Sequence, residues 1–160
     1  MNHSCNVCFG EGGAGTFSDG KLQTQVKDKS GRIRKILEIF VEHGADSSIL
    51  YDNKPHIGTD ILTSVVKNMR NHMIILGAEV RFQTTFTGFI QKNGELCAVE
   101  VTRADGSKEV IETSVCVLAI GHSARDTFLR LHQLGLKMEN KPFAVGLRIQ
   151  HDQNVINESQ

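Results

Sequence analysis

The sequence has no excess of charge of either sign and no long hydrophobic run. Its 18 basic residues balance 18 acidic ones, so no global electrostatic field favours nucleic acid or an anionic membrane as a partner. No segment approaches the roughly 20 apolar residues that a helix needs to cross a bilayer. The opening segment MNHSCNVC lacks the basic and apolar regions of a secretory signal peptide. We therefore expect a cytoplasmic protein that binds neither nucleic acid nor a membrane.

The sequence also lacks a second Cys-x-x-C pair. Four cysteines are present, and only Cys5 and Cys8 have this spacing. A zinc ribbon needs a second pair, whereas Cys97 and Cys116 stand far apart in strand-like sequence. A thioredoxin-type motif should lie between a strand and a helix, but here a glycine-rich segment follows it. Because no export signal is recognised, we predict reduced thiols that are buried or incidental, and no metal site.

Glycine, in contrast, is abundant and concentrated near the N-terminus. The segment Phe9–Leu22, FGEGGAGTFSDGKL, contains five of the 15 glycines. Glycine allows positive φ angles and lets the backbone approach a ligand closely. Successive N–H groups in such a loop can form a concave anion site. A phosphate-bearing ligand is therefore the first hypothesis, and a surface loop without a ligand is the alternative.

The spacing of apolar residues predicts two helices after this loop. The first runs from about Arg32 to His43, where apolar residues recur with the helical period. The second begins at the N-cap candidate Thr59 and ends at Gly77. Its paired apolar positions favour packing against a sheet, with Met69 and Met73 in the core.

From Glu79 onward the apolar period changes to two, which is typical of strands. Val80 and Phe82 alternate with polar neighbours and indicate a first strand. Three further short strands are expected at 86–90, 96–102 and 108–112. The dipeptides Asn93-Gly94 and Asp105-Gly106 are hairpin turn signals, so these strands form an antiparallel meander.

A continuous apolar run at Val115–Ile120 has the composition of a strand buried on both faces of a parallel sheet. Gly121 ends this run, and a helix capped by Ser123 is expected to follow. Residues 142–149 contain a further expected strand. This order of elements indicates an α/β fold with an inserted antiparallel β-meander.

The glycine-rich segment is compatible with more than one class of nucleotide-binding protein. Gly15–Lys21 satisfies most of the phosphate-binding motif of nucleoside triphosphatases, but Leu22 stands where a Mg²⁺-ligating hydroxyl is required. No segment matches a GxGxxG dinucleotide motif after a strand. A third interpretation joins two sites, because Gly121 and the following helix N-terminus lie where doubly wound sheets bind ligands. A dinucleotide, whose pyrophosphate has two phosphate groups, suits two sites of backbone donors, the glycine-rich loop and this helix N-terminus.

Five segments, in order, resemble a family of bacterial and archaeal FAD-dependent dehydrogenases of unassigned substrate. They are NVCFGEGGAGTFSDGKL, KPHIGTD, VCVLAIGHSARDTF, FAVGLRIQH and INESQ, between Asn6 and Gln160. The resemblance implies a partial glutathione-reductase-like FAD-binding domain with an incomplete Rossmann-like sheet. In glutathione-reductase-like flavoproteins, an Ala-Thr-Gly-like triplet lies near the flavin, and the resemblance implies that Ala119-Ile120-Gly121 stands at that position. It also implies that the backbone around Val80 lies near the adenine.

The resemblance assigns cofactor-binding roles to residues in several segments. The candidates are Gly12, Gly13, Ala14, Gly15, Thr16, Ser18, Asp19, Lys21, Val80, Ala119, Gly121 and His122. His122 and His56 are the catalytic candidates, since histidine exchanges protons near neutral pH. A hydrogen-bonded structural histidine is the alternative for each. The sequence offers no nucleophile–base pair, which is compatible with a flavoenzyme because the cofactor carries the redox chemistry.

The resemblance also implies a division of the chain into parts of one FAD-binding domain. We expect a glycine-rich cofactor loop at 1–30, a helical segment at 31–78, a strand and meander at 79–113, a buried strand and helix at 114–135, and the start of the next sheet element at 136–160. Members of the family are longer and begin with a GxGPAG-type loop. We therefore predict that the chain is an internal fragment or a truncated gene product lacking the N-terminal GxGxxG unit.

The implied activity is hydride transfer between FAD and an unidentified substrate or NAD(P)H. One alternative is a non-catalytic fragment that does not retain FAD. Another is a nucleotide- or phosphate-binding module without redox activity. We expect weak or absent flavin retention, and self-association through an exposed sheet edge.

Overall fold

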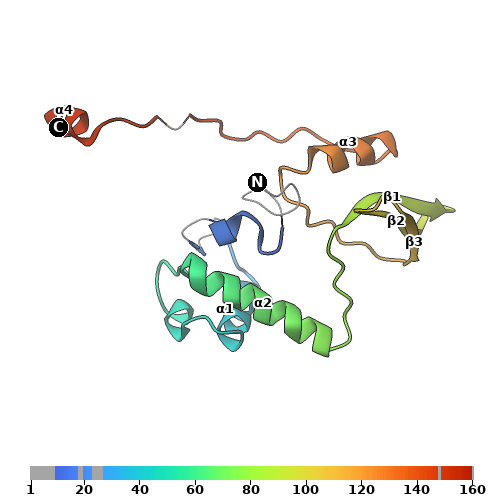
Figure 1. Ribbon diagram of the computed structural model, residues 1–160, viewed down its shortest axis with the longest axis horizontal. Helices are drawn as coiled ribbons and strands as arrows, with labels where there is room; N and C mark the ends of the chain where they lie inside the picture. Colours follow the sequence, from blue (N-terminus) through green and yellow to red (C-terminus); the bar gives the residue numbers. More distant parts are fainter. Residues whose placement is uncertain (1–9, 18–19, 23–26, 148, 160) are drawn as a thin grey trace.

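The chain folds into a mixed α/β structure in which two helices and a small sheet occupy separate regions (Figure 1). The computed structural model describes residues 10–17, 20–22, 27–147 and 149–159. Helices α1 (Arg32–Glu42) and α2 (Thr59–Ile75) lie side by side, away from the sheet and helix α3 (Arg125–Gln133). A long extended segment then leads away from the rest of the molecule to the short helix α4 (Gln153–Ser159).

The helical region contains the larger apolar core. One face of α1, one face of α2 and the short 3₁₀ helix η2 (Ser47–Leu50) contribute to it. Its buried residues are Ala45, Ile49, Ile57, Leu62 and Val65, of which Val65 is fully inaccessible. Both predicted helices are confirmed. The expectation that the second helix packs against a sheet is wrong, because its buried face joins the same core as α1.

The two core methionines that we expected on α2 have different environments. Met69 packs against the apolar core, as predicted, whereas Met73 is exposed near the end of the helix. Gly77 follows the helix with a φ of 93°, which is the left-handed conformation that commonly ends helices. The predicted end of α2 is therefore confirmed.

The helix starts differ slightly from the sequence prediction. The N-cap of α2 is Gly58 rather than Thr59, and that of α3 is Ala124 rather than Ser123. Neither cap residue makes a side-chain hydrogen bond to its helix. At α1, the carboxylate of Asp28 accepts from the first backbone N–H groups of the helix, so an acidic residue outside the helix satisfies that end.

The predicted meander is confirmed as a three-stranded antiparallel sheet in the order β1-β2-β3. Its strands are β1 (Thr84–Lys92), β2 (Glu95–Arg103) and β3 (Lys108–Glu112). The first turn has positive φ angles at Asn93 (55°) and Gly94 (84°), which is the backbone geometry of a tight hairpin. Ala98, Val99 and Val101 of the central strand are buried, and α3 packs beside β1.

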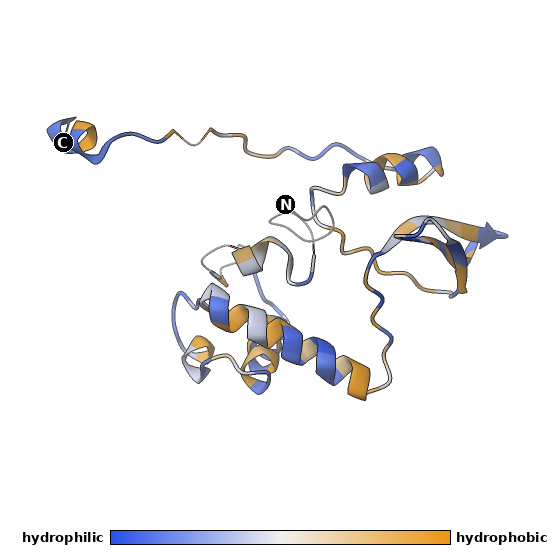
Figure 2. Cartoon of the chain, in the orientation of Figure 1, coloured by the Kyte–Doolittle hydropathy of each residue, from blue (hydrophilic) through white to orange (hydrophobic). Residues whose placement is uncertain are grey.

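Three predicted strands are not formed among the described residues. The segments 79–82, 115–120 and 142–147 lie outside every strand, and the described residues contain no parallel strand pair. The last two segments contain apolar residues (Figure 2), and their exposed fractions reach 84% at Val117 and 92% at Leu147. These residues have the composition of buried strands, but the described chain offers them no neighbouring strand to pair with.

Candidate functional site

The glycine-rich segment folds into a tight turn followed by the 3₁₀ helix η1 (Gly13–Phe17). Gly10, Gly12 and Gly13 have positive φ angles of 113°, 81° and 56°. The N–H of Gly13 donates to the carbonyl of Gly10 over 3.1 Å, and the hydroxyl of Thr16 donates to the carbonyl of Gly13 over 2.9 Å. A Cβ atom on Gly12 would lie 2.2 Å from Cγ2 of Thr16, so this turn requires glycine there.

The same segment is joined to the loop that precedes α2. The N–H of Ile57 donates to the carbonyl of Gly20 over 2.9 Å, and the N–H of Leu22 donates to the carbonyl of Pro55 over 3.0 Å. Gly20 has a φ of 66°, and a Cβ atom on it would lie only 1.6 Å from the carbonyl oxygen of Ile57. The two backbones therefore approach so closely that only glycine fits at this position.

This antiparallel bridge places Lys21 directly opposite His56. Both side chains are exposed. The sequence identified each residue separately, one as a cofactor-binding candidate and the other as a catalytic candidate. The structure brings them together, which the sequence did not predict, because an isolated bridge has no periodic pattern.

The glycine-rich loop is also held against α2. Oε2 of Glu11 lies 2.8 Å from a guanidinium nitrogen of Arg70, whose guanidinium carbon is 5.4 Å from the centre of the Phe82 ring. A Cβ atom on Gly15 would lie 3.9 Å from a methyl of Leu62, an ordinary van der Waals separation. Ala14 and Gly15 are exposed, so their part of the loop faces outward from a supported position.

The remaining predicted site residues do not join this arrangement. Ser18 and Asp19 lie outside the described residues. Ala119, Gly121 and His122 are exposed and take no part in the bonds of the bridge. Nε2 of His122 lies 3.4 Å from the hydroxyl of its neighbour Ser123. The expectation that His122 follows a buried strand is wrong, since the segment before it forms no strand and is mostly exposed.

Val80, the predicted neighbour of the adenine, is half-buried and lies outside every strand. The adjacent Arg81 connects this linker to β3, because its guanidinium donates to Glu79 over 2.6 Å and to Glu109 over 2.8 Å. Arg103 donates to the other oxygen of Glu109. These hydrogen bonds, first from Arg81 and then from Arg103, lower the pKa of Glu109 below its usual range. The linker around Val80 is therefore tied to the meander by charge pairs.

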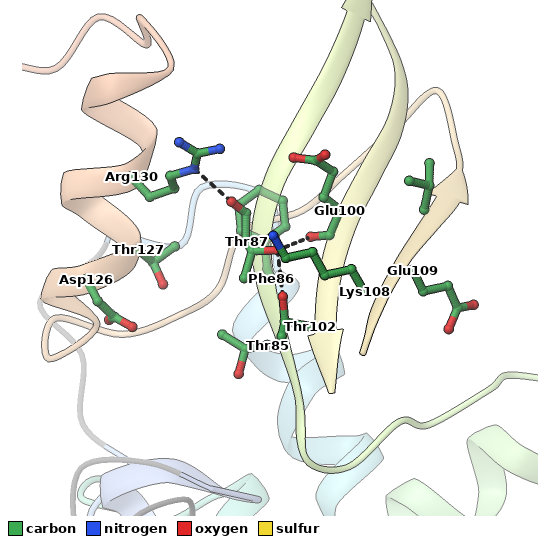
Figure 3. Close-up of a pocket in the computed structure, with 11 residues that line it drawn as sticks. Thr85, Phe86, Thr87, Glu100, Thr102, Lys108, Glu109, Asp126, Thr127 and Arg130 are labelled. Carbon is green, nitrogen blue, oxygen red and sulfur yellow. Dashed lines mark hydrogen bonds between the residues drawn. The ribbon is translucent and has the colours of Figure 1, made fainter. Parts of the chain in front are cut away.

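A cavity of about 420 Å³ lies between the meander and α3, and no sequence pattern indicated it (Figure 3). Residues from β1, β2, β3 and α3 line it. The strand side includes three threonines, Thr85, Thr87 and Thr102, while Asp126 and Arg130 line the cavity from the helix. Threonine is an ordinary strand residue, so its presence in the sequence did not distinguish this face from any other.

A bulge in β1 positions part of this cavity. The register shifts between Phe86 and Gly88, which leaves Thr87 unpaired with a residue of β2. The carbonyl of Thr87 accepts from Nε of Arg130 over 2.9 Å, and its hydroxyl lies 3.2 Å from the hydroxyl of Thr102 (Figure 3). The bulge thus frees a backbone acceptor that fixes α3 beside the sheet.

Other chemistries have little support in the part of the chain that the structure describes. Within those residues, no group of three or more histidine, cysteine, aspartate or glutamate side chains could hold a metal ion. Their helices are all too short or too polar to cross a membrane. Cys97 and Cys116 are free thiols, as expected; both are exposed, so of the two expected environments the buried one does not apply to them. Cys5 and Cys8 lie outside the described residues.

No family model matches the sequence. Over all 160 residues, the chain is 43% identical to an uncharacterised protein of Clostridium beijerinckii. The chain spans 29% of the length of that relative. It is therefore similar along its whole length to part of a longer protein.

Proposed function

We propose that the chain is a segment of an FAD-dependent oxidoreductase, in which the glycine-rich loop contributes one side of the FAD site. The observation that carries this proposal is the bridge between Lys21 and His56. It joins two of the segments on which the resemblance to FAD-dependent dehydrogenases rests, although they are far apart in the sequence. The similarity to part of a longer protein supports the proposal that other parts of such a protein complete the site.

The geometry of the loop fits a phosphate-bearing cofactor in two respects. The loop exposes residues Ala14 and Gly15, and a Cβ atom on Gly13 would meet no atom of the described residues within 4 Å. The carboxylate of Glu11, which would repel a diphosphate, is neutralised by Arg70 at 2.8 Å. The paired carboxylate of Glu11 therefore adds little repulsion toward an anion that faces the backbone N–H groups of the loop.

Each candidate residue has a distinct task in this proposal. The backbone of Gly13 to Thr16 orients the cofactor, while Lys21 adds a positive charge beside it. His56, across the bridge, is the candidate for holding or moving a proton near the reacting group. When bound, FAD supplies the capacity for hydride transfer, and the protein supplies binding, orientation and electrostatics.

A titration of FAD with the purified chain, followed by flavin fluorescence, tests the proposal. We expect saturable but weak binding, because the cofactor's remaining contacts must come from elsewhere. A parallel titration with ADP and inorganic phosphate separates the alternatives. Equal affinity for ADP and FAD would favour a nucleotide-binding module without redox activity. No response to any of the three ligands would contradict the proposal and leave a non-catalytic fragment.

The proposed catalytic role of His56 has its own test. In FAD-loaded protein, His56→Gln should slow flavin reduction by a hydride donor such as NAD(P)H and change its pH dependence, while FAD affinity stays the same. Replacement of the exposed His132 on α3 is the matched control. Identical rates and pH profiles in wild type and His56→Gln would remove His56 from the proposal without affecting the FAD-binding loop.

A further inference from the structure

We propose that His43 and His72 form a binding site for a divalent late first-row transition metal. The site lies between the C-terminal ends of α1 and α2, and it is independent of the proposed FAD site. Nε2 of His43 lies 2.9 Å from Nδ1 of His72, and the ring centroids are 5.1 Å apart. Two ring nitrogens from different helices therefore face each other at close range.

The protonation state of His43 is determined by its other nitrogen. Nδ1 of His43 lies 2.6 Å from the carbonyl oxygen of Ile39. A carbonyl can only accept, so Nδ1 carries the proton and donates it. In the neutral ring, Nε2 then has a free lone pair that points at His72. A backbone carbonyl that orients a histidine in this way is the usual support for a metal ligand.

The pair of facing nitrogens holds a single proton when both rings are neutral. In that state, Nδ1–H of His72 donates to Nε2 of His43. A metal ion would take the place of this proton, which moves to Nε2 of His72, so no proton is lost overall. Two imidazole nitrogens on one tetrahedral metal are about 3.4 Å apart, given metal–nitrogen bonds of about 2.0–2.1 Å. The observed separation needs to increase only slightly.

Two further features favour a cation at this position. His43 is the C-cap residue of α1, and His72 lies in the last turn of α2, so the negative ends of both helix dipoles point toward the site. The amide of Asn68 donates to the carbonyl of His43 over 2.9 Å and fixes the end of α1 against α2. Because the two histidines are partly or fully exposed, an ion reaches them without unfolding and keeps water as its other ligands.

The class of metal follows from the ligands. Imidazole suits zinc, copper and nickel, whereas magnesium and calcium prefer oxygen ligands. Since no third side-chain ligand lies close among the described residues, two nitrogens alone provide the site, and we expect moderate affinity. The function of such a site is to link the ends of α1 and α2.

Nickel chloride is a suitable probe, with the histidine ring signals of the full chain observed by NMR. The sequence also offers Ni²⁺ the amino terminus with His3, and the thiols of Cys5 and Cys8, so the test uses a background with His3→Gln, Cys5→Ser and Cys8→Ser. We expect paramagnetic broadening first at the rings of His43 and His72. His43→Gln and His72→Ala should each weaken binding by at least about tenfold.

His132 provides the matched control, because it is an exposed histidine in the last turn of another helix, α3. His132→Gln should leave the affinity for Ni²⁺ unchanged. The proposal would be overturned if the first broadened signals belonged to other residues, or if His72→Ala bound as tightly as the background protein. Because the ring of His72 is exposed, its removal tests the site even if His43→Gln loses helix content.

Discussion

At the scale of single residues, glycine has two different roles in this chain. Gly20 is required because a side chain there would collide with the backbone of Ile57, 1.6 Å away. Gly31, at the start of α1, has nearly the same φ, 69° against 66°, but a Cβ atom on it would meet no atom of the described residues within 4 Å. The two positions share one backbone conformation and differ only in their neighbours.

The pair gives a matched prediction for stability. Gly20→Ala should lower the free energy of unfolding by about 3 kcal/mol or more, because it adds a collision to the cost of a positive φ. Gly31→Ala should lower the free energy of unfolding by only about 1–2 kcal/mol, because it adds the cost of a positive φ without a collision. Urea denaturation followed by circular dichroism measures both. Equal losses of unfolding free energy at the two sites would show that the backbones of Gly20 and Ile57 do not approach each other in solution.

The sequence predicts the backbone conformation of single residues well, but it does not predict which distant residues contact one another. The glycine-rich segment and Asn93-Gly94 were recognised because positive φ angles restrict the choice of residue. The sequence did not predict three contacts that the structure shows. These are the pairing of Lys21 with His56, the ion pair of Arg70 with Glu11, and the contact of His43 with His72. Such contacts depend on how elements that are distant in the sequence pack together, and local sequence patterns do not indicate this packing.

At the scale of elements, the linker before β1 depends on charge. Arg81 and Arg103 hold the pKa of Glu109 below its ordinary value of 4.5, and Arg81 does the same to the pKa of Glu79. A carboxylate whose pKa is lowered on folding stabilises the native state above its unfolded pKa. That contribution is lost as the pH falls through the lower, folded value.

A pH titration therefore provides a test of this linkage. The Cδ resonance of Glu109 should titrate with a midpoint below 4.5. Glu109→Gln should be less stable than wild type at neutral pH, and the difference should shrink as the pH falls below 4. Salt should reduce the difference, because all these side chains are accessible to ions. A midpoint at or above 4.5 would mean that Arg81 does not pair with Glu109 in solution.

Hydrogen exchange distinguishes the elements that form from those that do not. Amides of Val99 and Val101 in the central strand should be protected, since both lie in the paired and buried part of β2. Amides of residues 115–120 should exchange at rates close to those of an unstructured peptide. Protection of 115–120 equal to that of β2 would mean that this segment forms a strand after all.

The contrast between these elements shows what local sequence can predict. Both strands of a hairpin lie within one short stretch, so the meander and its turns were predictable from period and turn residues. A strand in a parallel sheet needs a partner from a distant part of a chain. Val115–Ile120 has the composition of such a strand, but among the described residues it has no partner and is mostly exposed.

At the scale of the whole molecule, apolar surface is the dominant physical feature. Four apolar residues stand at alternate positions of the sequence after Pro142, and all four are largely exposed: Phe143, Val145, Leu147 and Ile149. Exposed edges with alternating apolar residues are templates for pairing with another chain. The molecule is therefore expected to associate with itself at concentrations where such contacts form.

Sedimentation velocity can measure this association. Wild type should contain species larger than a monomer, and the double substitution Val117→Lys with Leu147→Lys should raise the monomer fraction. Leu129→Lys is the control, because Leu129 is also exposed but lies on the formed helix α3. A wild-type chain that remains a monomer at every concentration would contradict the expectation.

The affinity of the glycine-rich loop for FAD tests the central proposal most directly. Gly15 has an ordinary φ, and a Cβ atom on it would lie 3.9 Å from a methyl of Leu62, so Gly15→Ala adds a methyl group to the loop without straining its backbone. Gly146→Ala is the matched control, because Gly146 has the same freedom in a distant segment. We expect wild type and Gly146→Ala to bind FAD equally, and Gly15→Ala to bind FAD at least about tenfold more weakly, a difference of about 1.4 kcal/mol in binding free energy. Equal affinities in all three proteins, or no binding of FAD by wild type, would contradict it.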